Sequence, residues 1–289
     1  MRFPAAACLA MLVFISACTA PDTGATSTAG QGATTSTSVD PSGLIAPCLV
    51  ESAGFVDAGA VIIGDGIGDA TTLETIRWET HPGCDRVEFG FLTRSGAPAS
   101  AIGTSVATLT PEAGVIRIQY PETVVSTGPN DVAFDTALIS AAYVVWTREG
   151  RLATDLHLAG SQNVAFAAAT TTSPARSIVD IRPIEGGDTV PMPPTVTDSL
   201  VLLTPTSGPA TYPIRITGYA KARDGEVVIR YTASGEVIEE RRTVAAGDGS
   251  SWGEFSIVID DGPSGATVLY VGTVVADTER GITIDLELA

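Results

Sequence analysis

Short alternating segments separated by turn residues constrain the fold of this chain more than any other feature. In residues 199–289, clusters of Gly, Pro, Asp and Ser interrupt segments rich in Val, Ile, Thr and Tyr. Such segments favour pleated, half-buried surfaces. They predict strands at residues 200–204, 212–219, 226–232, 237–244, 252–260, 266–275 and 283–288. Short strands with turns roughly every 8–12 residues indicate an antiparallel sandwich of the immunoglobulin type.

Residues 47–183 show a similar pattern. The apolar residues of Val87-Glu88-Phe89-Gly90-Phe91 alternate with polar ones, and the turn sequence His81-Pro82-Gly83 lies just before them. This spacing predicts a hairpin. We expect strands at residues 73–78, 85–91, 115–120, 142–147, 153–158, 164–168 and 177–182, and a short helix at 134–141. The predicted fold class is all-β, with two antiparallel β-sandwich domains, 47–183 and 199–289, joined by a Gly/Pro-rich linker at 184–198.

The N-terminus has the pattern of a bacterial lipoprotein signal. Arg2 precedes an apolar segment from Ala5 to Ile15, and Ser16-Ala17 leads directly into Cys18. The segment is too short to cross a bilayer as a mature helix, so residues 1–17 are set aside as a signal peptide. An ordinary secretory signal is the alternative, but small residues followed at once by Cys favour lipidation. Thioether-linked diacylglycerol plus an N-acyl chain such as palmitate would anchor Cys18 stably.

Residues 18–46 are mostly Ser, Thr, Gly, Ala and Pro, with few large apolar side chains. Such a segment cannot bury enough surface to fold, so we expect a disordered tether. As a flexible coil of about 28 residues it would span roughly 30 Å. The predicted location is therefore extracytoplasmic, on the outer face of the cell membrane.

The chain has four cysteines. Cys8 lies in the signal and Cys18 is the lipidation site, which leaves Cys48 and Cys84 as a disulfide in an oxidising compartment. The bond would close a loop of about 37 residues and stabilise the fold by roughly 3–4 kcal/mol. A metal site that recruits His81 or His157 is the alternative, but no CxxC spacing is present.

The formal net charge is −17, with 33 acidic and 16 basic residues, and Lys221 is the only lysine. Such an acidic surface repels phosphate backbones, so nucleic-acid binding is excluded as a function. Solubility is the simplest reason for the charge.

Few motifs suggest chemistry. Asp65 and Asp69 in the Gly-rich stretch 63–69 are candidate calcium ligands. The alternative is an ordinary loop, which is favoured because the pattern lacks the remaining acids of an EF-hand. A catalytic triad built on His81, or on His157 with Asp155, would need a nucleophile on a G-x-S-x-G elbow, and this motif is not present. Two carboxylate pairs fit solvated strands and turns better than a glycosidase cleft, Asp85 with Glu88 and Asp260 with Asp261. We therefore expect no enzymatic activity and no cofactor.

The three tryptophans raise a choice between a carbohydrate-stacking platform and the core. Trp252 is expected in the core. Trp78 and Trp146 are candidate ligand-binding residues, so an exposed aromatic patch would belong to the first domain.

Two family resemblances are carried by these motifs. Cys84-Asp85-Arg86-Val87-Glu88-Phe89-Gly90-Phe91, with a terminal strand at Ser177-Ile178-Val179-Asp180-Ile181, resembles AMIN-like domains of actinobacterial lipoproteins. Residues 199–289 resemble the Gmad2 domain, an immunoglobulin-like domain named for bacterial spore germination. The matching motifs are Leu203-Thr204-Pro205-x-x-Gly208, Ile214-x-Ile216-x-Gly218-x-Ala220 and Trp252-Gly253-x-Phe255. There Gly218 suggests close backbone approach, and Trp252 with Phe255 suggests core.

The AMIN-like resemblance implies a β-sandwich with a role in envelope localisation or wall binding, and supplies no catalytic residues. We expect a non-catalytic binding or scaffolding lipoprotein whose ligand is peptidoglycan, another wall glycan or an envelope protein. The alternative is an envelope enzyme or an accessory regulator of a cell-wall hydrolase. A sporulation or germination role follows only from the name of the second family.

Overall fold

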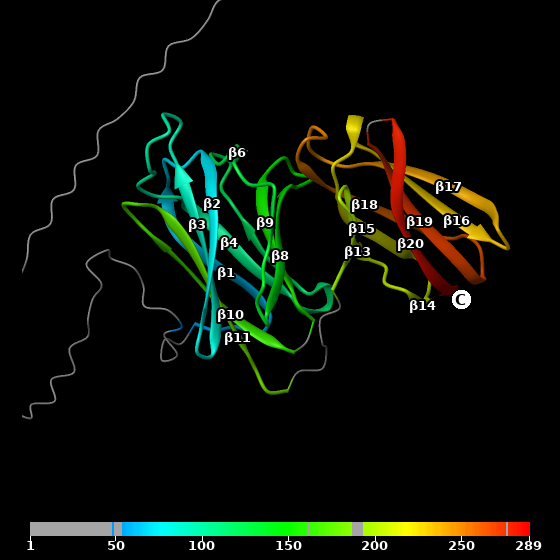
Figure 1. The fold of residues 1–289 in the computed structure, drawn as a ribbon, viewed down its shortest axis with the longest axis horizontal. Coiled ribbons are helices and arrows are strands. Elements are labelled where there is room, and N and C mark those ends of the chain that lie inside the picture. Colours follow the sequence, from blue (N-terminus) through cyan, green and yellow to red (C-terminus); the bar gives the residue numbers. More distant parts are fainter. Residues whose placement is uncertain (1–47, 49–53, 161, 187–192, 276) are drawn as a thin grey trace, which may run out of the picture. The chain divides into compact units, whose positions relative to one another are not determined.

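The computed structural model describes residues 48, 54–160, 162–186, 193–275 and 277–289 (Figure 1). The described residues are all-β, as the sequence predicts, and their two helical elements are single 3-10 turns, η1 (Pro111–Ala113) and η2 (Arg223–Gly225). None of their helical segments is long and apolar enough to cross a bilayer. The predicted signal peptide (1–17) and the predicted tether (18–46) lie outside the described residues, so neither prediction can be compared with the structure.

The first half encloses one hydrophobic core between two layers of strands. One layer is a sheet in the order β10-β11-β3-β2-β6. Its strands are β2 (Thr72–His81), β3 (Cys84–Leu92), β6 (Ser126–Thr127), β10 (Val164–Thr171) and β11 (Arg176–Pro183). The other layer contains β1 (Gly59–Ile67), β4 (Gly103–Thr110), β5 (Val115–Gln119), β7 (Asp131–Ala133), β8 (Ile139–Trp146) and β9 (Leu152–Leu158). Phe89 and Val179 from the first layer join Ile118 and Leu156 from the second in the core.

The second half repeats this plan with different strands. One layer holds β12 (Thr195–Val196), β13 (Leu200–Thr204), β15 (Ile214–Ala220) and β18 (Trp252–Ile259). The facing sheet holds β14 (Gly208–Ala210), β16 (Glu226–Ala233), β17 (Glu236–Val244), β19 (Gly265–Val275) and β20 (Thr278–Leu288). Ile216 and Phe255 pack on Tyr231 and Leu269 between them. The seven strands expected here are all present.

Gly218 in β15 has the close backbone contact that the sequence suggests. A Cβ atom at this position would lie 2.0 Å from the carbonyl oxygen of Val201 in the neighbouring strand β13. It would also lie 2.9 Å from the ring of Phe255, which is fully buried. Only glycine therefore fits here without displacing backbone.

A parallel pairing joins the two halves into one ten-stranded sheet. Trp252 and Gly253 of β18 pair with Val145 and Trp146 of β8. The sheet order is β1-β4-β5-β9-β8-β18-β15-β13-β12, with β7 beside β8. All described residues belong to the unit Val39–Ala289. The division into two domains around a linker at 184–198 stays a prediction, and part of that linker lies outside the described residues.

Three local predictions are wrong. Residues 134–141 form no helix, because β-branched Ile139 begins strand β8 after a turn in which Thr136 Oγ1 accepts a hydrogen bond from the Ile139 amide at 3.0 Å. The Gly-rich stretch 63–69 is not a loop up to Ile67, since β1 continues through a register shift there. Residues 208–210 lie outside the predicted strands but form the short strand β14, which pairs with β20.

The sandwich layers are also not purely antiparallel. The pairings β2–β6, β8–β18 and β14–β20 are parallel. Two of them involve strands of two or three residues, and the third joins the long strands β8 and β18 through two residue pairs. The antiparallel expectation holds for the other pairings between long strands.

Candidate functional site

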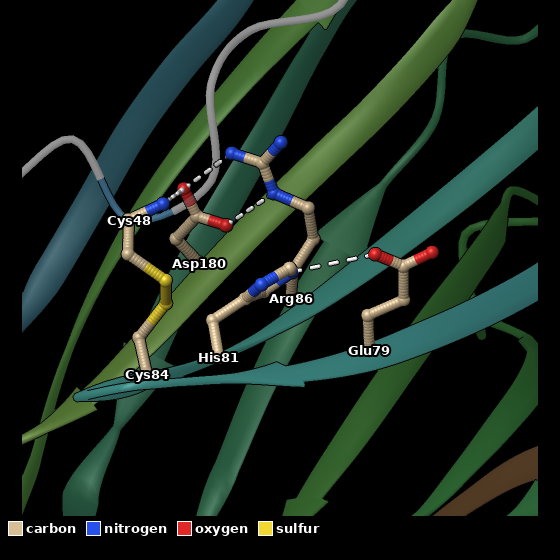
Figure 2. Close-up of a disulfide and its surroundings, with 6 residues drawn as sticks. All are labelled: Cys48, Glu79, His81, Cys84, Arg86 and Asp180. Atoms are coloured by element: carbon tan, nitrogen blue, oxygen red, sulfur yellow. Dashed lines mark hydrogen bonds and ion pairs between the residues drawn. A yellow bond between two sulfur atoms is a disulfide. The ribbon is translucent and has the colours of Figure 1, made fainter.

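The disulfide predicted from cysteine counting is present. Cys48 and Cys84 are paired, with their Cα atoms 6.0 Å apart (Figure 2). Cys84 begins β3 directly after the hairpin turn, where it is opposite His81 and where Gly83 takes a positive φ of 89°. The bond therefore fastens Cys48 to a central strand of the first sheet.

A buried ion pair lies beside this disulfide. Arg86 of β3 donates from Nε and Nη2 to the two carboxylate oxygens of Asp180 in β11, both at 2.7 Å (Figure 2). The side chains are 4% and 12% exposed, and the register places the residues directly opposite each other. The amide of Cys48 also donates to Asp180, at 3.3 Å. Bidentate geometry makes this a strong, orienting contact.

Cys48, Cys84 and Asp180 also form a potential metal-ligand set within the described residues, with ligand atoms within 4.8 Å of one another. Both sulfur atoms are joined in the disulfide, and the carboxylate accepts the Arg86 fork. His81 contacts Glu79 at 3.4 Å instead of joining this set. In this arrangement the cluster is a covalent and ionic clamp.

The two candidate calcium ligands are separated in role. Asp65 is exposed on β1. The carboxylate of Asp69 accepts hydrogen bonds from the amides of Ser100 and Ala101, at 2.8 and 2.9 Å, and from the Ser100 hydroxyl at 3.0 Å. The hydrogen bond donated by the backbone amide of Ala101 has the largest effect in lowering the pKa of the Asp69 carboxyl group. Asp69 therefore holds the loop that leads into β4.

The tryptophan candidates lie in different sheets. Trp78 of β2 is 40% exposed, and its ring meets Phe134 edge-on at 4.9 Å. Trp146 of β8 is half-buried and packs against the core of the first half. No ring contact joins the two among the described residues. Trp252 is buried, as expected, but it packs where β18 meets β8 and not inside the second core.

Asp155 and His157, the Asp-x-His sequence of β9, face this meeting point. Asp155 is fully buried, and both its oxygens accept hydrogen bonds from Arg117 of β5 at 2.8 Å. Tyr219 of β15 donates a further hydrogen bond to Asp155, and Arg117 reaches Glu254 of β18 at 3.1 Å. One buried carboxylate thus ties strands of the first half to strands of the second.

Electrostatics in this network favour fixed charge states. Burial opposes the charged form of Arg117, but the hydrogen bond and charge of Asp155 prevail and raise its pKa above the usual value. Burial and the charge of Asp155 raise the pKa of Tyr219, so its hydroxyl stays protonated and donates. Burial lowers the pKa of His157 to about 4. Neither ring nitrogen of His157 has a hydrogen-bond partner, and the ring packs on Tyr143 at 4.8 Å.

A second link between the halves centres on Asp131 of β7. Its Oδ2 accepts hydrogen bonds from Lys221 Nζ and Trp252 Nε1, both at 2.7 Å. Although burial acts in the opposite direction, these two donors lower the pKa of Asp131. Lys221, the only lysine, also lies over the Trp252 ring, 4.3 Å from its centroid.

A solvent-accessible hollow lies on the outer face of β2, β3 and β11, and we call it the outer groove. Its volume is about 270 Å³. Thr75, Gly90 and Arg176 lie side by side across its floor, because Gly90 pairs with both neighbours in register. Charged side chains line its length: Glu74, Arg77, Glu88 and Arg176. Sequence reasoning assigned Glu88 and Gly90 to the polar face of a strand but did not identify a hollow there.

No protein-family model and no curated protein matches this chain. The AMIN-like and Gmad2 resemblances therefore stay expectations.

Proposed function

We propose that this protein is a membrane-anchored lipoprotein of the cell envelope that acts as a non-catalytic binding or scaffolding module. Lipidated Cys18 would hold it at the outer face of the membrane, and residues 18–46 would let the β-structure reach outward. The ligand would be a wall glycan such as peptidoglycan, or an envelope protein. The AMIN-like motifs of β3 and β11 support the wall-binding version.

The observation that carries the proposal is the use of the buried ionisable groups. Arg86 and Asp180 clamp neighbouring strands beside the disulfide. Asp155 is committed to Arg117 and to Tyr219. These buried groups hydrogen-bond to other groups of the same fold. A general acid or base would instead need to reach a proton of the substrate. The arrangement is that of a rigid support.

A binding role also suits the surface. The outer groove opens on a sheet face and carries both positive and negative side chains. Rigid strands hold such residues more precisely than loops do.

Retention on purified cell-wall material tests the proposal. The full-length protein in mild detergent is expected to sediment with wall sacculi and to be released by soluble wall fragments. A protein of similar size and acidity serves as the control for non-specific trapping. If the full-length protein stays in the supernatant, the wall-binding version is wrong; if it cleaves the sacculi, the non-catalytic assignment is wrong.

A further inference from the structure

The outer groove exists because a glycine interrupts a row of side chains. On the outer face, Thr75 and Arg176 are the neighbours of Gly90 across β2 and β11. A Cβ atom at Gly90 would lie 2.5 Å from Thr75 Oγ1, so even alanine would enter the hollow. Gly90 does not take a positive φ, so the backbone does not require glycine there. The space itself is the feature that calls for an explanation.

The charges beside this hollow are only partly paired. Arg176 Nη1 donates to Glu88 Oε2 at 2.7 Å, and both side chains line the groove. Arg77 lies in the next row, opposite Glu88, and is exposed. Neither Arg77 nor Glu74 has an ion pair within the described ranges of the chain. The groove thus offers an open guanidinium at one position and an open carboxylate at another.

This pattern selects the chemistry of the occupant. Two arginines and two glutamates make the lining neutral on balance, within a protein whose net charge is −17. A purely anionic ligand would be repelled by the whole molecule, and a purely cationic one would meet two guanidinium groups. A ligand with both a carboxylate and an ammonium group suits both open charges, since guanidinium binds carboxylate with directed hydrogen bonds.

We propose that the outer groove binds a short zwitterionic peptide, with its carboxylate at Arg77 and Arg176 and its ammonium group at Glu74. The stem peptides of peptidoglycan have this chemistry, so the inference rests on the proposed wall-binding function and names the part of the wall that is read. Gly90 leaves room for the peptide backbone, and Thr75 supplies a hydroxyl to it.

Titration calorimetry with the full-length protein tests this assignment. The probe is the free stem tetrapeptide, compared with forms in which its carboxylates are amidated or its amine is acetylated. Amidation is expected to weaken binding about tenfold or more, as is Arg77→Gln, because each removes one side of a charge-assisted contact. Once Arg77 is neutralised, amidation should cost much less, since the two changes remove the same interaction.

Arg280→Gln is the matched control, because it makes the same change at an exposed position of β20 in the other half. It should bind the tetrapeptide as the native protein does. Gly90→Ala tests the space in the groove and leaves its charges unchanged. The added methyl group should weaken tetrapeptide binding while the thermal midpoint of unfolding changes little. Equal sensitivity to amidation in the native and Arg77→Gln proteins overturns the assignment.

The two proposals fail in distinguishable ways. Retention on sacculi that is unchanged by Arg77→Gln, with no binding of the tetrapeptide, would leave wall binding intact and refute the groove. Tetrapeptide binding without retention on sacculi would support the groove and refute wall binding.

Discussion

Replacing Asp155 with asparagine perturbs the contact that joins the two halves most directly. Asparagine keeps the shape of the side chain but removes the charge that Arg117 faces. The Arg117 guanidinium then retains only Glu254, at 3.1 Å, as an ionic partner within the described structure. The Tyr219 hydroxyl also loses its charged acceptor.

The expected cost follows from burial. Breaking a fully buried ion pair costs about 3–5 kcal/mol. Asp155 has no exposed side-chain surface, but Arg117 is 29% exposed, so water can compensate for part of its charge. We therefore expect Asp155→Asn to lower the free energy of unfolding by about 2–3 kcal/mol. For a chain of this size the thermal midpoint should fall by about 5–10 °C.

Chemical denaturation of the full-length protein, followed by circular dichroism and by tryptophan fluorescence, measures this cost. Trp252 reports on the meeting point itself because it packs there. Asp285→Asn makes the same change at an exposed position of β20 and should leave the midpoint unchanged. If Asp155→Asn is no more destabilising than Asp285→Asn, the network does not hold the halves together.

Three further predictions concern single features. Replacing Cys48 and Cys84 with serine should cost about 4 kcal/mol in denaturant unfolding, since the bond spans a sequence separation of 36, and no loss would mean that the bond constrains little. Burial lowers the pKa of His157 to about 4 in the folded protein, whereas an unfolded histidine has a pKa near 6.5. The free energy of unfolding should therefore be highest above about pH 6.5 and fall by about 3 kcal/mol toward pH 4, because protonation favours the unfolded state. His157→Phe should flatten that part of the pH profile, and an unchanged slope would assign it to other groups. Gly218→Ala should destabilise by about 1–3 kcal/mol because its methyl group meets the Val201 carbonyl, and a neutral result would show that the strands can separate there.

The alternation of apolar and polar residues was enough to predict most long strands. It located all seven of the second half, where turns are short and each strand has one buried face. It missed β1 and its partner β4. In β1, Gly64 and Gly66 take positive φ values and break the alternation while the pairing with β4 continues. A strand with such a bulge can be identified from its pairing with a neighbouring strand, and a single sequence does not indicate which strand that is.

For the polar clusters, the sequence indicated even less about which distant residues come into contact. Cysteine counting gave the Cys48–Cys84 pair because only two cysteines remained. Arg117 and Tyr219 look like ordinary strand residues, and nothing near them in sequence indicates that Asp155 will meet both. Their contact depends on the pairing of β8 with β18, which rests on two residue pairs far apart in the chain. Alternation predicts which face a residue is on, but not what lies opposite.

Fractionation of cells that produce the native protein or Cys18→Ser tests the proposed anchor most directly. The proposal predicts that the native protein sediments with membranes and enters the detergent phase, while the Cys18→Ser protein is released in soluble form with its β-structure intact. Continued membrane partition of Cys18→Ser would contradict the lipid anchor on which the proposed role depends.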